Sequence, residues 1–321
     1  MSADNAMNLL SHQVVRNLKS VGEPCISPDA SKLAYTLSWI DQEQLQTRSQ
    51  IIMRDLSDGT EHKFTRGPND INAKFSPSGN YLAFLRPTQT SHIQQTTTIN
   101  QTGEVSDNTQ SHRQLWVIPT DGGEASQLSH VEGDIFSYSW STDSESIAFS
   151  ARVNKSRIKF DSQPQAIHIT ELDYRHDTLG LKGEWRFHIF SANVATMETL
   201  QLTDGDWDDT SPVCSPDGSS IAFISSRLEN RHLRSGTEAY VISNQGGEPQ
   251  LWSGHLGGIG ALAWSPNGDR LLALASEYPG YMVIWQSWLY FLEPHSKPIR
   301  LSDDSFRPNV CLLYTSDAAD E

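Results

Sequence analysis

The chain is poor in cysteine and in long apolar runs, and both shortages exclude classes of protein. Its 321 residues include three cysteines, Cys25, Cys214 and Cys311, which form neither a CxxC pair nor a disulfide framework. No apolar run is long enough to span a bilayer, and the amino-terminal segment lacks the basic and apolar regions of a secretory signal. We therefore expect a cytoplasmic protein without a membrane partner.

Basic charge is also scarce. The chain has 24 Lys and Arg against 39 Asp and Glu, for a net charge of −15 that is spread along the sequence. Nucleic acid is therefore not an expected partner. The histidines are scattered, with His168 and His188 on separate expected strands, and the acidic run DGDWDD (204–209) lacks the spacing of a calcium loop. We expect neither a metal nor a cofactor.

What the sequence does contain is a pattern that recurs five times. In each copy one expected strand ends, a tetrad similar to Ser-Pro-Asp-Gly turns the chain, and an alternating apolar stretch runs back. Pro presets φ at the second position of a type I turn and Gly suits the fourth, so the tetrads predict hairpins. The copies are CISPDASKLAYTLS (25–38), FSPSGNYLAFLR (75–86), WSTDSESIAFSAR (140–152), CSPDGSSIAFISSR (214–227) and WSPNGDRLLALAS (264–276).

A second recurring pair of strands lies between the tetrads. QLWVIPTDGGEASQLSH (114–130) and AYVISNQGGEPQLWSG (239–254) each predict a strand, a Gly-rich turn and a short strand, which makes four strands per repeat. The tetrad serines, at 27, 76, 141, 215 and 265, are 49, 65, 74 and 50 residues apart. Four-stranded units of about this length are typical of β-propeller blades, so we expect an all-β propeller with five blades in this chain.

Two of the intervals are lengthened by insertions. Residues 88–113 are polar and nearly free of core residues, and predict a surface excursion between adjacent strands. Residues 169–190 predict an alternating, aromatic-bearing hairpin with Gly180 and Gly183 near its tip. We expect this second insertion to project over one face of the propeller.

Several stretches resemble one known family. LDYRHDTLGLKGEWRFHIF (172–190) and LQLTDGDWDDTSPVCSPDGSSIAFISSRLENR (200–231) resemble the N-terminal β-propeller of the prolyl oligopeptidase family of serine peptidases. VGEPCISPDASKLAYTLSWID (21–41) and QLWVIPTDGGEASQL (114–128) are similar to its acylaminoacyl-peptidase (dipeptidyl-peptidase-like) branch. The resemblance extends over residues 9–310.

The resemblance implies a second domain that this chain does not contain. Members of the family typically join a seven-bladed propeller to a C-terminal α/β-hydrolase domain, whose Ser-Asp-His triad has its serine on a G-x-S-x-G elbow. That elbow is absent here, and no strand-helix alternation follows the fifth repeat. We therefore expect five of seven blades, a truncation before the hydrolase domain, and no catalytic residue in this chain.

The end of the sequence supports the expectation of a truncation. PIRLS (298–302) predicts the closing strand of the fifth blade, and no sixth tetrad follows. CLLYTSDAADE (311–321) resembles the translation of a transposon-end adapter used to prepare DNA sequencing libraries. The alternative is an acidic, poorly ordered tail. We expect residues 1–310 to form an incomplete propeller and residues 311–321 to be non-native.

Three residues of the second insertion are candidates for a substrate channel: Tyr174, Arg175 and Trp185. An exposed arginine can pair bidentately with a peptide carboxylate, and aromatic side chains line peptide-accepting clefts. The alternative interpretation is a hairpin that packs on the propeller or on the absent domain.

The function implied by the resemblance is that of a gating domain. Such a propeller caps the active-site cleft, admits short or unstructured peptides, and docks on its own hydrolase domain. The parent protein would hydrolyse short peptides or N-acyl-aminoacyl peptides through an acyl-enzyme, and the fragment alone would be inactive.

A second class of function stays open. SGHLGGIGALAWSPNGDRLLALASEYPGYMVIW (253–285) also resembles a Trp-Asp repeat, with Gly254-His255 and a closing Trp285. That likeness favours a non-enzymatic scaffold of the Trp-Asp-repeat or Tol-system type, which binds other proteins. The unequal blade lengths and the insertion at 169–190 argue against it.

Overall fold

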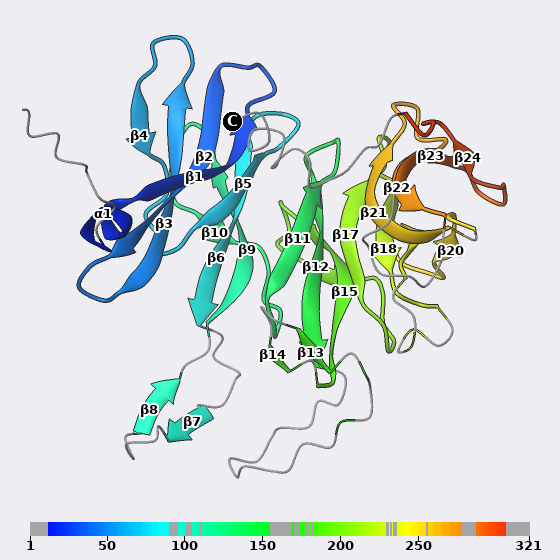
Figure 1. Ribbon diagram of the computed structural model, residues 1–321. Helices are drawn as coiled ribbons and strands as arrows, with labels where there is room; N and C mark the ends of the chain where they lie inside the picture. Colours follow the sequence, from blue (N-terminus) through cyan, green and yellow to red (C-terminus); the bar gives the residue numbers. More distant parts are fainter. Residues whose placement is uncertain are drawn as a thin grey trace, which may run out of the picture. The chain divides into compact units, whose positions relative to one another are not determined.

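The structure is a computed structural model, and it describes residues 12–89, 96–99, 105–108, 111–154, 169, 172, 174–176, 180–181, 183–228, 231, 233, 236–254, 256–277 and 287–305 (Figure 1). The described elements are one short helix, α1 (His12–Asn17), and strands β1 to β24. His168 and the adapter-like residues 311–321 lie outside the described residues.

Twenty of the strands form five four-stranded sheets, in which strands adjacent within each repeat are neighbours. The first sheet contains β1 (Lys19–Ile26), β2 (Lys32–Asp41), β3 (Gln46–Asp55) and β4 (Glu61–Lys63). The second contains β5 (Ile71–Phe75), β6 (Tyr81–Gln89), β9 (Ser111–Pro119) and β10 (Ser126–Gln127). The third contains β11 (Ile135–Trp140), β12 (Ser146–Asn154), β15 (Trp185–Asn193) and β16 (Thr199–Gln201).

The last two sheets repeat the same plan. The fourth contains β17 (Asp209–Cys214), β18 (Ser220–Ser225), β19 (Glu238–Ser243) and β20 (Gln250–Leu251). The fifth contains β21 (Gly257–Trp264), β22 (Leu271–Ser276), β23 (Trp288–Leu292) and β24 (Ile299–Arg300). Five four-stranded sheets confirm the expected blades, and β24 confirms the closing strand predicted at residues 298–302.

The chain divides into two compact units. The first comprises Met1–Thr88 and Leu115–Gln127, and the second comprises Gln89–Gln114 and Leu128–Glu321. In the first unit, apolar side chains of the first two sheets pack into one core. Its largest fully buried members include Met53, Leu82 and Phe84. This core forms because alternate residues of a strand point to the same face of its sheet.

In the second unit, the fourth sheet is buried on both faces. Along β18, Ile221 and Phe223 pack with Ile189 of the third sheet, whereas Ala222 and Ile224 pack with Leu271 of the fifth. A strand that is covered on both sides contains consecutive apolar residues instead of alternating apolar and polar ones. This explains why the residues after the tetrads are so apolar.

The tetrads form one end of every sheet, which we call the tetrad edge. In each tetrad the serine Oγ accepts a hydrogen bond from the backbone N–H five residues later, as Ser215 does from Ser220 at 3.0 Å. Gly218 N–H donates to the Ser215 carbonyl oxygen at 3.0 Å and has a φ of +71°. This left-handed conformation favours glycine, so the predicted turns are confirmed.

Both insertions differ in detail from the expectation. The polar insertion at 88–113 contains a two-stranded hairpin, β7 (Thr96–Ile99) and β8 (Val105–Asn108). In the other insertion, β13 (Arg175–His176) pairs with β14 (Gly180–Leu181). The boundary predicted at residue 190 is wrong, because Trp185 begins β15 and pairs with Asn154 of β12. Residues 185–190 thus belong to the third sheet itself.

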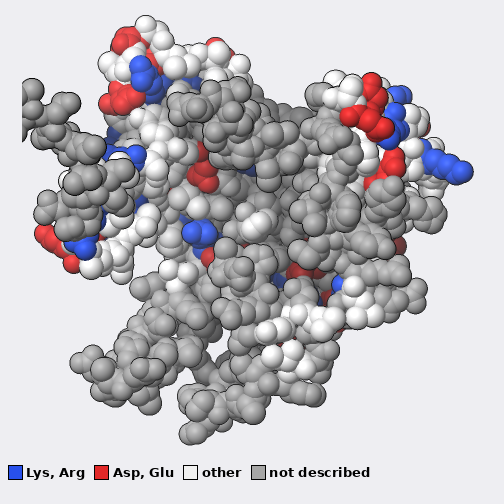
Figure 2. All heavy atoms as spheres, in the orientation of Figure 1, with Lys and Arg blue, Asp and Glu red and all other residues white. Residues whose placement is uncertain are grey.

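The described surface is mixed in charge. Figure 2 shows lysine and arginine interleaved with aspartate and glutamate on the face that it presents. None of the described helices is long and apolar enough to cross a membrane.

Candidate functional site

The end of the sheets opposite the tetrad edge carries a second recurring set of residues, which we call the arginine edge. In the second, third and fourth sheets an aspartate lies at or directly before the start of the first strand, and an arginine lies toward the end of the second strand or just beyond it. The three pairs are Asp70 with Arg86, Asp134 with Arg152, and Asp209 with Arg227.

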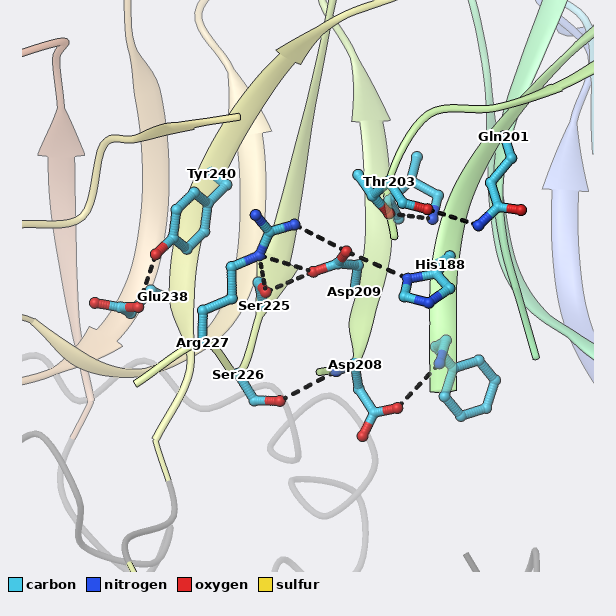
Figure 3. Close-up of polar contacts among 12 residues, drawn as sticks. His188, Gln201, Thr203, Asp208, Asp209, Ser225, Ser226, Arg227, Glu238 and Tyr240 are labelled. Atoms are coloured by element: carbon cyan, nitrogen blue, oxygen red, sulfur yellow. Dashed lines mark hydrogen bonds and ion pairs between the residues drawn. The ribbon is translucent and has the colours of Figure 1, made fainter. Parts of the chain in front are cut away.

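The fourth sheet shows the most extensive set of contacts at this edge (Figure 3). Asp209 is fully buried, and its Oδ1 accepts a hydrogen bond from Ser225 Oγ at 2.5 Å. The Arg227 guanidinium donates from Nη2 to Asp209 Oδ2 at 2.9 Å and from Nε to Oδ1 at 3.3 Å. This two-pronged geometry compensates for the burial of both charges.

Aromatic rings surround the Arg227 guanidinium. Its central carbon lies 4.7 Å from the ring centroid of Trp207, 4.8 Å from that of Tyr240 and 5.5 Å from that of Phe223. Tyr240 donates its hydroxyl hydrogen to Glu238 at 3.0 Å. Burial, together with the charge of Glu238, raises the pKa of Tyr240 well above its ordinary value, so the phenol stays protonated.

His188 lies on the other side of Asp209. Its side chain is 6% exposed, and its Nδ1 is 3.7 Å from Asp209 Oδ2. Ser225, Asp209 and His188 do not form a catalytic triad, because Asp209 lies between the other two residues. In a triad the histidine lies next to the serine and accepts its proton. This cluster therefore holds strands together and does not activate Ser225.

The acidic run at 204–209 is engaged by arginines. Asp206 forms ion pairs with Arg186 and with Arg231, each at 2.9 Å. Among the described residues, no group of three His, Cys, Asp or Glu side chains has the geometry to hold a metal ion.

The second sheet repeats the buried ion pair. Asp70 is fully buried and accepts hydrogen bonds from Arg86 Nε at 2.7 Å and from Nη2 at 2.9 Å. The guanidinium also lies over the rings of Phe84 and Trp116. A Cβ added to Gly67 would lie 2.0 Å from Arg86 Nε, so glycine at this position makes room for the arginine.

The third sheet breaks the pattern. Asp134 accepts hydrogen bonds from the Arg113 backbone N–H at 2.9 Å and pairs with His112 Nδ1 at 3.3 Å. Burial alone would raise the pKa of Asp134, but these contacts hold it below the ordinary value. Arg152 instead lies over the ring of Trp185, 5.4 Å from the centroid.

The three candidate channel residues have different positions. Trp185 lies at the arginine edge of the third sheet, in contact with Arg152. Tyr174 is exposed directly before β13, and Arg175 is in β13. Trp185 thus lies at the arginine edge, whereas Arg175 belongs to the β13–β14 hairpin and Tyr174 directly precedes that hairpin.

Sequence reasoning missed the arginine edge, although a signal was present. In the second, third and fourth repeats an aspartate precedes the tetrad serine by six or seven residues, and an arginine follows it by ten to twelve. Aligning the repeats beyond the tetrad would have paired Asp70 with Arg86 and Asp209 with Arg227.

The described cysteines are not poised for nucleophilic chemistry. Burial raises the pKa of Cys25 above its ordinary value and raises that of Cys214 to about 11. Both thiols therefore stay protonated at neutral pH, and the thiolate is the nucleophilic form.

Comparison with known proteins places the chain among peptidase relatives, although no family model matches it. It is 25% identical over 241 residues to the uncharacterized peptidase YuxL of Bacillus subtilis, covering 73% of this chain and 34% of that protein. It is 22% identical over 299 residues to dipeptidyl-peptidase 5 of Porphyromonas endodontalis, covering 85% and 39%. The chain thus spans well under half the length of either relative.

A solved structure shows the same fold. The acylaminoacyl peptidase of Pyrococcus horikoshii superposes with a TM-score of 0.61 at 14% identity, over 87% of this chain and 39% of that protein. The alignments and the sheets together confirm the resemblance: the chain is a homologue of peptidases, and its five sheets are β-propeller blades of the kind found in the prolyl oligopeptidase family.

Proposed function

We propose that this chain is the gating propeller of a serine peptidase that hydrolyses short peptides or N-acyl-aminoacyl peptides. The observation that carries the proposal is the alignment of 73% of the chain with about one third of a peptidase. A segment of that size that folds into propeller blades leaves room in the relative for a separate catalytic domain. The hydrolase domain is then the principal partner of these blades, and the acyl-enzyme forms on its serine.

Three described side chains that could act as nucleophiles lack the surroundings for it, which supports a separate catalytic domain. Asp209 separates Ser225 from His188, and the Cys25 and Cys214 thiols are protonated. The propeller contributes selection of the substrate, and Tyr174, Arg175 and Trp185 are its candidate contact residues. A cytoplasmic location is part of the same proposal.

Labelling with a fluorophosphonate probe tests the proposal. The gene is expressed from its source genome to the natural stop codon, beside the 321-residue chain. We expect the longer product to be labelled and to hydrolyse N-acyl-peptide p-nitroanilides, and the shorter chain to remain unlabelled.

Two outcomes would overturn the proposal. Labelling of the 321-residue chain would place a reactive serine within it. A folded longer product that is neither labelled nor active would favour the alternative, a non-enzymatic scaffold for protein binding.

A further inference from the structure

Arg152 differs from its counterparts at the arginine edge. Arg86 and Arg227 each donate two hydrogen bonds to a fully buried aspartate. The corresponding carboxylate of the third sheet, Asp134, instead binds His112 and the Arg113 backbone N–H of β9. Among the described residues, no carboxylate forms a hydrogen bond or an ion pair with the Arg152 guanidinium.

Aromatic side chains lie on the same face of the third sheet as this arginine, and the ring of Trp185 contacts its guanidinium. Arg152 pairs across the sheet with Phe187, and Asn154, two residues further along β12, pairs with Trp185. Arg152, Trp185 and Phe187 therefore share one face of the sheet. Phe136 packs on Phe187 with ring centroids 5.5 Å apart, and it is 59% exposed although it belongs to β11. The result is a partly open aromatic face beside a cation.

The backbone is shaped to bring these groups close together. A Cβ added to Gly133 would lie 2.7 Å from Arg152 Cβ and 3.0 Å from Trp185 Cζ3. Because Gly133 has no side chain, the backbone just before β11 can lie close to both Arg152 and Trp185.

Arg152 is partly desolvated, and the nearby Asp134 and Asp208 act on it through their charges without a hydrogen bond or ion pair to its guanidinium. Burial lowers the pKa of Arg152 below its ordinary value, and the charges of Asp134 and Asp208 offset this only in part. Asp208 Oδ1 accepts a hydrogen bond from the Phe187 backbone N–H at 3.0 Å. A partly desolvated guanidinium is stabilised by an acceptor that matches its planar fork, and a carboxylate has that geometry.

We propose that Arg152 binds the carboxylate of a short peptide, with Trp185, Phe187 and Phe136 packing against an apolar side chain of the same peptide. This proposal rests on the proposed function, because a peptidase propeller meets peptides as ligands. It assigns to the third sheet a carboxylate-binding group that the second and fourth sheets use for internal ion pairs. Arg152 would thus make a carboxylate contact of the same kind as the one that the sequence suggests for Arg175.

Isothermal titration calorimetry on the 321-residue chain tests this proposal without any hydrolysis. The probes are acetyl-Ala-Ala-Phe, its C-terminal amide, and acetyl-Ala-Asp-Phe-amide. We expect Arg152→Gln to weaken binding of a carboxylate-bearing probe by about tenfold to hundredfold, as for loss of charge-assisted hydrogen bonds. Binding of acetyl-Ala-Ala-Phe-amide should change less than twofold.

The two carboxylate probes distinguish the source of the anion. A selective loss with acetyl-Ala-Ala-Phe identifies a peptide C-terminus, and a selective loss with acetyl-Ala-Asp-Phe-amide identifies an acidic side chain. Either result supports the role of Arg152. Equal affinity of the wild type and Arg152→Gln for both carboxylate probes would overturn it.

Arg270→Gln is the matched control. Arg270 also lies over an aromatic ring, that of Phe291 at 5.2 Å, but it has ion-pair partners in Asp269 and Glu293. Its substitution should leave all three affinities unchanged.

Arg152→Lys is a second variant, which keeps the positive charge and loses the planar guanidinium. It should retain part of the affinity for the carboxylate-bearing probes. Fluorophosphonate labelling of the longer product is independent of these titrations. A failure of the proposed peptidase function is therefore distinguishable from a failure of the Arg152 assignment.

Discussion

The two ends of the sheets are stabilised in different ways. At the tetrad edge the same hydrogen bond, from a backbone N–H to a serine five residues earlier, recurs in all five sheets. At the arginine edge the partners are 16 residues apart in Asp70–Arg86, 18 in Asp209–Arg227 and 22 in His112–Asp134. Contacts at the first end are local and uniform, and those at the second are distant and differ between sheets.

This difference shows where the blades are free to specialise. A tight turn demands particular residues, because the serine and a left-handed fourth position occur together in all five tetrads. An ion pair between separate strands can exchange one partner for another, as Asp134 does when it pairs with His112 in place of Arg152. The residues at the arginine edge are therefore less constrained by backbone geometry than those of the tetrads.

The largest effect should come from breaking a buried ion pair at the arginine edge. We expect Arg227→Gln to lower the free energy of unfolding of its unit by about 3 kcal/mol, because Asp209 would remain buried without its cation. Urea denaturation followed by tryptophan fluorescence measures the change.

Arg152→Gln is the comparison for that measurement. This arginine has no bonded carboxylate among the described residues, so its loss should cost less than half as much as the loss of Arg227. Equal losses for the two variants would show that the sheets do not differ at this edge.

A smaller effect is expected at the tetrad edge. Ser215→Ala removes the acceptor of the Ser220 backbone N–H and should lower the free energy of unfolding by about 1 kcal/mol. Differential scanning calorimetry checks the value against Ser296→Ala, an exposed position outside the tetrads. A loss as large as that of Arg227→Gln would contradict the expectation that a single tetrad contact stabilises the fold less than a buried ion pair does.

The smallest effect should appear in acid. Hydrogen bonds from Ser215 and Ser219 lower the pKa of Asp217 from 3.8 to about 2. Because the pKa is lower in the folded state, the ionised carboxylate stabilises the fold above pH 4, and this contribution is lost as the pH falls from 4 to 2.

The Asp217→Asn variant tests this pH dependence. The difference in urea midpoint between the wild type and Asp217→Asn should be constant above pH 5 and shrink below pH 4. A difference that stays constant down to pH 2.5 would show that Asp217 is not ionised in the native turn.

Much of the fold could be predicted from the sequence, whereas little of the site could. The tetrads predict the hairpins because φ at Gly79, Gly218 and Gly268 is decided by residues within the turn itself. The start of β15 was misplaced because Trp185 continues an aromatic, alternating run that does not show which strand it pairs with. The role of Arg175 stays a prediction, and that of Arg152 emerged only from its surroundings.

The sequence by itself determined that this chain builds repeated four-stranded blades, because tight turns and alternating apolar strands are specified by residues close together in the chain. Only the tertiary structure decided which aspartate each arginine meets. Arg86, Arg152 and Arg227 occupy equivalent places in the repeats, yet two are bound to buried carboxylates and one is not. That outcome depends on segments far apart in the sequence, since His112 of β9 in the second sheet binds the carboxylate of Asp134, which precedes β11 of the third sheet, and Arg152 lies beside Trp185 instead.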